Sequence, residues 1–312
     1  MGKIVKLKKF FFFLLTFFEL TNIFAQGERK SVVALSRSIA QMWLLSGGTL
    51  LGTTEDALDE NTESVFPLGE FVLNVHPKMQ KSTISIGNLS SPNLEALLSL
   101  KPDLVLLTQD IPAHKKLFSR LKNSTDVIIV DVKTFSDYES YMNQFTKMTN
   151  RADLYEKNVV QVKNDIQNII KSVPNHKNQS FLLLRTSSAK NKILKNHFTS
   201  EILCDLGLTP VVSDSSGLDV LSMEALFSLN PDWIFVTSQG DEKKAIQSFE
   251  ADFVSRPAWK NLKAVKNGQV VFLTKELYNY KPNELWAEAY AYLYTILYGT
   301  LDKSVFSSKR HL

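Results

Sequence analysis

The sequence contains a single cysteine, Cys204, in 312 residues, so an intramolecular disulfide is impossible. Histidines are also few, and none of them pairs at a spacing typical of a metal site. G-x-S-x-G, Walker and G-x-G-x-x-G motifs are missing, as is a Cys/His pair in an activating context. We therefore expect no intrinsic cofactor, no metal site and no enzyme activity, and bare-metal binding or catalysis in a cleft stays a less favoured alternative. The histidines referred to above are His76, His114, His176, His197 and His311, which are scattered along the chain.

The chain also lacks a concentrated basic surface, although its formal net charge is +4. Four lysines and only one acid, Glu19, fall within residues 1–25, so the remainder is close to neutral. Binding to nucleic acid requires many cations on one face to neutralise phosphates. We therefore expect no nucleic-acid partner.

The basic start has a meaning of its own. Lysines precede the apolar block at residues 10–18, which is shorter than the roughly 20 residues that cross a bilayer. This layout predicts a cleavable secretory signal peptide over residues 1–25, with cleavage after Ala25. No cysteine stands at that point to carry a lipid anchor, so we expect a soluble periplasmic product.

Sixteen residues occur twice in recognisable form. Residues 94–109 read LEALLSLKPDLVLLTQ and residues 223–238 read MEALFSLNPDWIFVTS, with eight identities at a constant offset of 129 residues. In each copy a helical stretch meets Pro-Asp and then an apolar run typical of a strand buried on both faces. The repeat predicts two α/β lobes of one design, with a ligand cleft between them.

The order of the predicted elements divides the chain into three parts after the signal. Strands alternate with helices in a first lobe at residues 26–150 and in a second lobe at residues 174–312. Residues 151–173 lack Gly and Pro and carry an apolar stripe, which predicts a single long connecting helix and only modest closure of the lobes. The strands are predicted at 31–35, 49–53, 83–86, 104–107, 127–130, 181–184, 208–212, 233–236 and 270–273.

Three smaller predictions concern single residues. Cys204 falls in an apolar helical pattern and is expected to be a buried, inert thiol. Asp103 and Asp232 stand in helix-to-strand turns, where local backbone hydrogen bonds would explain them. A last helix is predicted from Asn283, as its N-cap, to Gly299, with an aromatic stripe that belongs to the core.

Several segments together carry a family resemblance. They are VVALSRSIAQMWLLSGG, IGNLSSPNLEALLSLKPDLVLL, LSMEALFSLNPDWIFVTSQGD, RPAWKNLKAVKNGQVVFL and YNYKPNELW. With the two lobes and the helical connector, the chain resembles the helical-backbone (class III) substrate-binding proteins of ABC importers for ferric siderophores, haem and cobalamin. Ser36-Arg37 replaces the Ser-Pro of many members, and Gln41 stands near a position often held by Glu, which puts the ligand's identity in doubt but not the fold.

The resemblance implies a role and a partner. The chain would capture a ferric siderophore, or alternatively haem or cobalamin, and deliver it as a monomer to a permease dimer with its cytoplasmic ATPase. In this family a glutamate on each lobe docks onto arginines of the permease, and the matching residues here are Glu95 and Glu224. Both would also stand in the first turn of a helix behind the N-caps Asn93 and Ser222, so a local role at the helix dipole is the alternative.

Ligand contacts are expected from the loops that leave the carboxyl ends of the strands. Positive charge from these loops and stacking aromatic side chains would suit an anionic, partly aromatic metal complex. The candidate ligand-binding residues are Arg37, Ser38, Trp43, Asp56, Arg185, Gln239, Tyr278, Tyr280 and Lys281.

Overall fold

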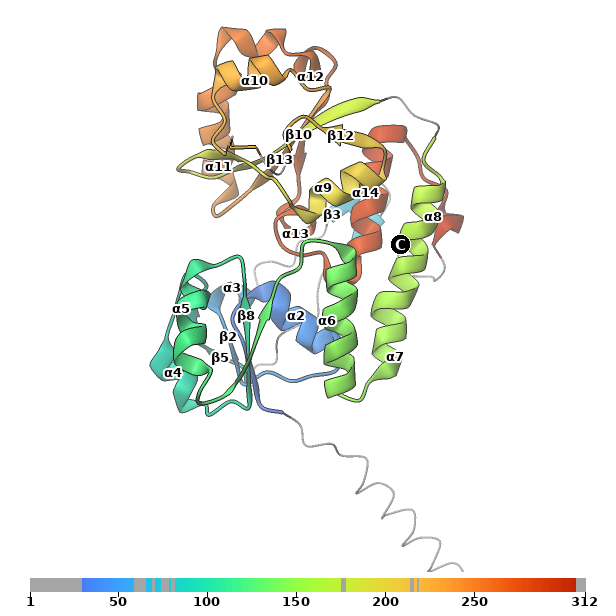
Figure 1. The fold of residues 1–312 in the computed structure, drawn as a ribbon. Coiled ribbons are helices and arrows are strands. Elements are labelled where there is room, and N and C mark those ends of the chain that lie inside the picture. The colour runs from blue at the N-terminus through green and yellow to red at the C-terminus, as the bar shows by residue number, and fades with distance from the viewer. Residues whose placement is uncertain are drawn as a thin grey trace, which may run out of the picture.

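The computed structural model describes residues 30–58, 66–68, 71–73, 79, 82–174, 178–213, 216–217 and 219–306. The predicted signal peptide at residues 1–25 lies outside the described residues. The chain forms two α/β lobes, each built on its own sheet, with helices running along one side between them (Figure 1). Within the described ranges, no helix is both long and apolar enough to span a bilayer.

The first lobe holds a parallel sheet of five strands. Their order is β5 (Ile84–Ser85), β2 (Gly52–Thr53), β1 (Val32–Ala34), β8 (Leu104–Thr108) and β9 (Asp126–Val130). Numbered along the chain, this order is 3-2-1-4-5, which matches five of the six strands of a Rossmann fold and places the switch point between β1 and β8. The helices are α2 (Arg37–Leu45), α3 (Glu55–Leu58), α4 (Leu94–Ser99), α5 (Pro112–Leu121) and α6 (Phe135–Met148), with the short pairs β3 (Phe66–Leu68) and β4 (Phe71–Leu73), and β6 (Gly87–Asn88) and β7 (Ser91–Pro92).

The second lobe also holds a sheet of five strands, one of which is antiparallel. β10 (Gln179–Thr186), β13 (Trp233–Ser238) and β14 (Val270–Leu273) are parallel, and β12 (Leu208–Pro210) and the antiparallel β11 (Asn191–Ile193) share the other edge of β10. Its α-helices are α9 (Phe198–Asp205), α10 (Met223–Leu229), α11 (Glu242–Phe249), α12 (Lys263–Lys266), α13 (Lys275–Tyr278) and α14 (Trp286–Tyr298). Shorter turns of 3-10 or π helix are η3 (Glu250–Val254), η4 (Pro257–Asn261), η5 (Asn283–Leu285) and η6 (Lys303–Val305).

The connection between the lobes is helical from Ala152 to Lys171. It consists of α7 (Ala152–Tyr155), a π-helical turn η2 (Glu156–Val160) and α8 (Gln161–Lys171). The sequence predicted a helix here, but its regular apolar stripe gave no sign of the wider turn. Within that turn the Asn158 carbonyl accepts a hydrogen bond from the Tyr138 hydroxyl at 3.2 Å, and the Asn158 amide donates to the Leu45 carbonyl at 2.9 Å. The π turn thereby ties the connector to α6 and α2 of the first lobe.

The two sheets share one hydrophobic core. On β1, Val32 and Ala34 face this core, whereas Val33 and the following residue, Leu35, face a separate cluster under α4 and α5. On β10, Phe181 and Leu183 reach the same shared core, which also contains buried residues of α2, α6, α8, α9 and α14. The lobes are therefore packed together along α6, α8 and α14, beyond the single covalent link of the connector (Figure 1).

The repeated Pro-Asp segments make the same long-range contact in both lobes. The Asp103 carboxylate accepts hydrogen bonds from the amide and hydroxyl of Ser31, each at 2.7 Å. The Asp232 carboxylate accepts the same two bonds from Ser180, each at 2.8 Å. The predicted local turn bonds are wrong, since each aspartate instead holds the start of the lobe's first strand.

Removing apolar volume from the shared core will destabilise both lobes together. Ile169 of α8 is fully buried in that core, so Ile169→Ala is expected to lower the free energy of unfolding by about 2–4 kcal/mol. Urea denaturation followed by circular dichroism should still show one transition. Gln167→Ala, at an exposed position of the same helix, is the control; two separate transitions in Ile169→Ala would show that the lobes fold independently.

Candidate ligand-binding cleft

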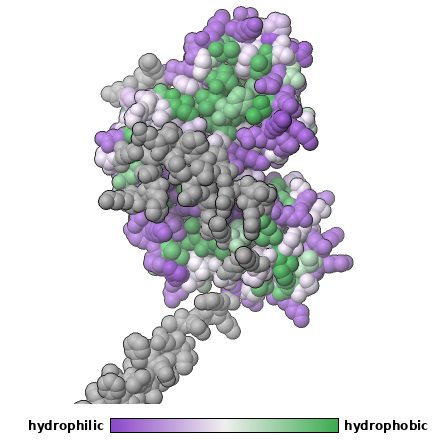
Figure 2. Space-filling view, turned by 180° about the vertical axis from the view of Figure 1, so that it is seen from behind, coloured by the Kyte–Doolittle hydropathy of each residue, from purple (hydrophilic) through white to green (hydrophobic). Residues whose placement is uncertain are grey.

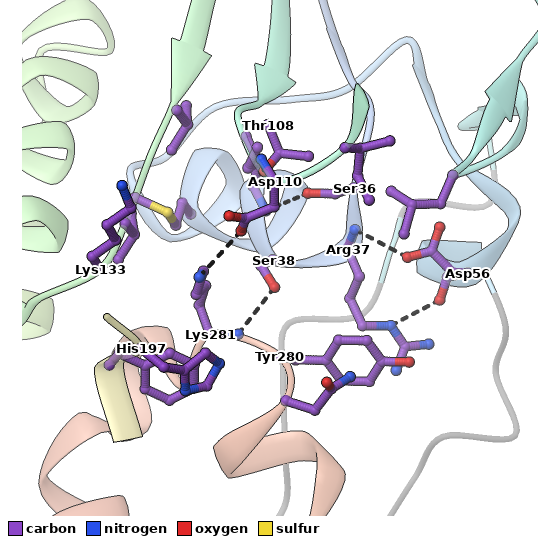
Figure 3. Close-up of a pocket in the computed structure, with 18 of the residues that line it drawn as sticks. Ser36, Arg37, Ser38, Asp56, Thr108, Asp110, Lys133, His197, Tyr280 and Lys281 are labelled. Atoms are coloured by element: carbon purple, nitrogen blue, oxygen red, sulfur yellow. Dashed lines mark hydrogen bonds and ion pairs between the residues drawn. The ribbon is translucent and has the colours of Figure 1, made fainter. Parts of the chain in front are cut away.

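A cavity of about 260 Å³ lies between the carboxyl ends of the two sheets (Figure 3). The first lobe contributes α3 and the segments after β1, β8 and β9. The second lobe contributes the end of β10 and the segments after β11, β13 and α13. Parallel α/β sheets bind ligands at this edge because strand ends and helix starts leave polar groups open there. The polar lining residues are Ser36, Arg37, Ser38, Asp56, Thr108, Asp110, Lys133, Arg185, Asn196, His197, Gln239, Asn279, Tyr280 and Lys281.

Arg37 is held rigidly at the wall of the cavity. Its Nε donates a hydrogen bond to the Asp56 carbonyl at 2.8 Å, and its backbone amide donates to the Asp56 carboxylate at 3.3 Å. The guanidinium carbon stands 5.4 Å from the centre of the Tyr280 ring, and the Lys275 ammonium is 5.7 Å from the same centre. Tyr280 of the second lobe therefore packs against two cations, one from each lobe. Figure 3 shows its ring beside Arg37.

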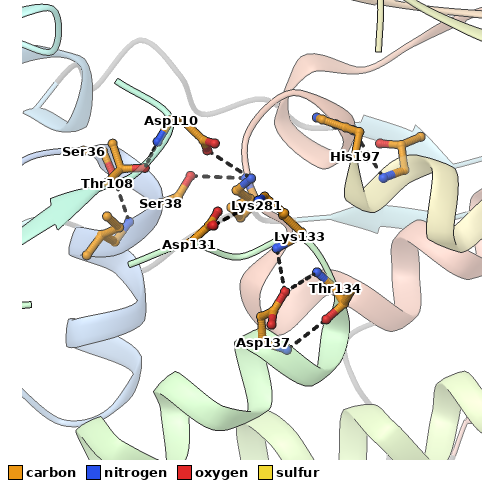
Figure 4. A network of polar contacts seen from close by, with 12 residues as sticks. Ser36, Ser38, Thr108, Asp110, Asp131, Lys133, Thr134, Asp137, His197 and Lys281 are labelled. Atoms are coloured by element: carbon orange, nitrogen blue, oxygen red, sulfur yellow. Dashed lines mark hydrogen bonds and ion pairs between the residues drawn. The ribbon is translucent and has the colours of Figure 1, made fainter. Parts of the chain in front are cut away.

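Lys281 joins the lobes across the cleft. Its ammonium forms an ion pair with Asp110 at 3.3 Å, and its backbone amide donates to the Ser38 hydroxyl at 3.2 Å (Figure 4). The Lys281 side chain is mostly buried and also stands 5.3 Å from the Phe198 ring centre. An anionic ligand that reached Lys281 would compete with Asp110 for its ammonium group. Ligand binding would therefore affect this ion pair, which joins the two lobes.

Asn283 forms a second bridge between the lobes. Its side-chain amide donates to the Ser38 carbonyl at 3.0 Å and to the Gln41 side chain at 3.2 Å. The prediction that Asn283 is a helix N-cap is wrong, because Asn283 is the first residue of the 3-10 turn η5 and α14 begins only at Trp286. Gln41, which stands near a position often held by Glu in the family, is buried, and its side-chain oxygen accepts the hydrogen bond from Asn283.

Arg185, at the end of β10, is the cation of the cavity that has no hydrogen-bond or ion-pair partner among the described residues. Its side chain is half-buried. Burial lowers the pKa of Arg185, and the nearby Asp110 partly opposes that shift. A guanidinium so placed is paired only when an anion enters, and it can bind a carboxylate with two parallel hydrogen bonds.

His197 supplies a neutral donor on the same side of the cavity. Its Nδ1 accepts a hydrogen bond from the Thr199 amide at 3.3 Å, and its ring packs on Phe198 with the ring centres 4.4 Å apart. Burial, together with Lys281 and Arg185, holds the pKa of His197 well below its usual value. The neutral imidazole then carries its proton on Nε2, so it can donate to a ligand oxygen.

The charges of the cavity favour an anion. Four cationic side chains and two acidic ones line it, and Lys133 is anchored by an ion pair with Asp131 at 3.1 Å (Figure 4). Another histidine close by, His114, is structural: its Nδ1 accepts from the Thr108 amide and its Nε2 contacts the Leu89 carbonyl. Within the part of the chain that the structure describes, no three His, Cys, Asp or Glu residues gather as a metal site.

Seven of the nine predicted ligand-binding residues line this cavity, and their contact with a ligand stays a prediction. They are Arg37, Ser38, Asp56, Arg185, Gln239, Tyr280 and Lys281.

Two predicted ligand contacts, Trp43 and Tyr278, are wrong because both side chains belong to the core. Trp43 donates from Nε1 to the Thr49 carbonyl at 2.9 Å and packs edge-on against Phe145. Tyr278 is fully buried and donates to the Ala289 carbonyl at 2.8 Å. The helical turn α13 ends at Tyr278, so its side chain turns inward while that of Tyr280 reaches the cleft.

The sequence did not single out Lys133, Asn196, His197 or Phe198 as lining residues. Lys133 follows β9, a strand that was predicted, so the rule about carboxyl ends could have found it. Asn196 to Phe198 follow β11, a short antiparallel edge strand that gave no recognisable pattern. These residues enter the site through the tertiary fold alone.

A polar contact between lobes lies beside the cavity. The Phe135 amide, at the start of α6, donates to the Glu201 carboxylate of α9 at 3.0 Å. Burial, opposed by that hydrogen bond but supported by Asp205 and Asp137, raises the pKa of Glu201 from 4.5 to about 7. Cys204 of α9 is exposed, so the predicted burial of this thiol is wrong. The buried face of α9 is occupied by Ile202 and Leu203 instead.

The two predicted docking glutamates stand at matching places. Glu95 and Glu224 are exposed in the first turns of α4 and α10. The N-cap predictions are confirmed: Asn93 accepts from the Ala96 amide and Ser222 from the Ala225 amide, each at 3.1 Å. Hydrogen bonds from its own amide and from Ser222 lower the pKa of Glu224, so this carboxylate is ionised at neutral pH.

Comparison with known proteins agrees with this architecture. A family model described as periplasmic binding protein matches residues 32–277. The chain is 30% identical over 190 residues to the Fe(3+)-citrate-binding protein YfmC of Bacillus subtilis, covering 60% of this chain and 58% of that one. It is 26% identical over 254 residues to the iron-uptake system-binding protein of the same organism, covering 78% and 79%.

A solved structure, Staphylococcus aureus IsdE complexed with heme, superimposes with a TM-score of 0.71 at 20% identity, over 90% of this chain and 100% of that chain. At that identity the likeness shows the fold. From the match over residues 32–277, the chain belongs to the periplasmic binding protein family. The resemblance and the two-lobed class III fold predicted from the sequence are confirmed.

Glu201 makes the stability of the fold depend on pH. A carboxyl group whose pKa is raised by folding destabilises the native state above its unfolded pKa, and this cost grows as pH rises from 4.5 toward about 7. Glu201→Gln keeps an acceptor for Phe135, so it should stabilise the protein at pH 8, by on the order of 1 kcal/mol because water screens the half-exposed group. Urea denaturation should show little difference at pH 4.5, and Glu156→Gln is the exposed control. An equal effect at both pH values would contradict the assignment.

Proposed function

We propose that the protein captures an anionic ferric chelate, a ferric siderophore or ferric citrate, and delivers it to the permease of an ABC importer. The observation that carries this proposal is the unpaired guanidinium of Arg185, half-buried beside Lys281 in a cavity with more cationic than acidic side chains. A chelate with carboxylate groups would pair with Arg185 and accept from His197 Nε2. The names of two relatives, a Fe(3+)-citrate-binding protein and an iron-uptake system-binding protein, support iron as the cargo.

The proposed role is binding outside the cytoplasm, with a permease dimer and its cytoplasmic ATPase as partners and no chemical change of the ligand. Haem and cobalamin are the alternative ligands of the same architecture. Haem would need an axial ligand from the protein. The two tyrosines that the sequence suggested for this role are engaged elsewhere, since Tyr278 is buried in the core and Tyr280 packs against Arg37 and Lys275. The hydrophilic chelate is favoured by the charge of the lining, in which cationic side chains outnumber acidic ones.

The charge of Arg185 is expected to set ligand affinity. Arg185→Gln should weaken binding of ferric citrate by about ten- to a hundred-fold, because a charge-assisted pair in a half-buried site is lost. Isothermal titration calorimetry on the purified chain measures this change. Arg120→Gln, an exposed arginine of α5, is the matched control. Unchanged affinity in Arg185→Gln would contradict an anion site at this position.

The exposed glutamates are proposed to orient the protein on the permease rather than to bind ligand. Glu95→Arg combined with Glu224→Arg should leave ferric citrate affinity unchanged but abolish uptake by cells, since two carboxylates that face permease cations reverse their sign. Glu242→Arg tests the alternative of a purely local role, because Glu242 stands in the first turn of α11. Loss of ligand binding in the double variant, or equal loss of uptake in Glu242→Arg, would count against docking.

A further inference from the structure

Two apolar side chains are exposed at the same position of the repeat. Leu98 of α4 and Phe227 of α10 are 129 residues apart, the offset of the duplicated segment. Their exposed fractions are 43% and 53%, whereas the preceding residues, Leu97 and Leu226, are fully buried. Each helix therefore buries one apolar residue under the lobe and presents the next one to solvent.

The exposed apolar residues stand beside the exposed glutamates. Leu98 follows Glu95 by three positions and Phe227 follows Glu224 by three, and residues so spaced are neighbours on a helix surface. Helices α4 and α10 lie toward the far ends of the two lobes, away from α8 (Figure 1). The same pair, one carboxylate and one apolar side chain, is thus displayed once on each lobe.

Exposure alone would not single out these residues. Apolar side chains reach the surface on both lobes (Figure 2), as they do on most proteins. Among the described residues, four other large apolar residues are exposed, but the residue 129 positions away from each is polar, so none of the four recurs as a pair. They are Ile84, Val220, Val254 and Phe272, and the residues at the 129-residue offset are Ser213, Ser91, Thr125 and Asn143, respectively.

We infer that Leu98 and Phe227 are apolar anchors for a partner that presents one complementary surface twice, which is the two-fold permease dimer of the importer. This inference rests on the proposed function and adds the residues that supply affinity. Carboxylates at the rim guide encounter and orientation, whereas burial of a leucine and a phenylalanine supplies binding free energy. Because the shared core fixes the distance between the lobes, both anchors engage together and reinforce one another.

The test measures affinity for the permease without any chelate. The importer's permease complex is placed in lipid nanodiscs, and binding of the full chain, empty of ligand, is followed by surface plasmon resonance. Leu98→Ser with Phe227→Ser should weaken binding at least about ten-fold, and each single variant should fall between the double variant and the unaltered chain. Leu98→Met with Phe227→Leu keeps apolar anchors and should bind within about two-fold of the unaltered chain.

Either of two results would overturn the inference: unchanged permease affinity in the serine variant, or equal loss in the apolar control. Circular dichroism and ferric citrate titration of each variant check that the fold and the cleft are intact. Permease binding that depends on Leu98 and Phe227, without any binding of ferric citrate, would refute the proposed ligand but uphold the anchors. Failure of the unaltered chain to bind the permease would refute both the partner and the anchors.

Discussion

The hydrophobic core shared by the two lobes is the constraint on which the rest of the structure depends. Residues of β1 and β10, at the centres of two separate sheets, pack into one cluster through α6, α8, α9 and α14. Trp286 stands at the middle of this contact, with its ring edge-on to Phe135 of the first lobe and to Phe198 of the second. The carboxyl ends of both sheets are therefore held facing each other before any ligand arrives.

This arrangement explains why the cleft is both rigid and polar. Backbone and side-chain bonds from Lys281 and Asn283 cross between the lobes at Ser38, next to the cavity. A shared core and these bridges oppose wide opening, so recognition relies on groups already in place, such as Arg37 against Asp56 and Tyr280. Arg185 differs from them because its partner has to come from the ligand, which links the charge of the cavity to its specificity.

The sequence predicted much of the fold because the signals were local. All nine predicted strands are present, and the duplicated segment pointed correctly to two lobes of one design. The predicted aromatic stripe of the last helix is also in the core, with Trp286 and Tyr290 buried. What failed required knowledge of packing: Trp43 and Tyr278 carry the chemistry of ligand-stacking residues, but their positions on α2 and α13 turn them into the core.

The same limit applies to the site. Arg37, Arg185 and Lys281 stand at or beside the ends of elements that the sequence predicted. His197 follows β11, a short edge strand for which the sequence gave no pattern. The Ser31–Asp103 and Ser180–Asp232 contacts show a related limit, because the repeat revealed the aspartates but not the serines that stand 72 and 52 residues earlier. Local periodicity predicts elements, but partners far apart in the chain appear only in the folded structure.

A crystal structure of the full exported chain with ferric citrate would test the central claim most directly. The account predicts the chelate between Arg185 and Lys281, with its carboxylates facing these cations and with the two sheets in the orientation described above. A chelate bound outside this cavity, or lobes rotated apart with the core around Trp286 opened, would contradict it.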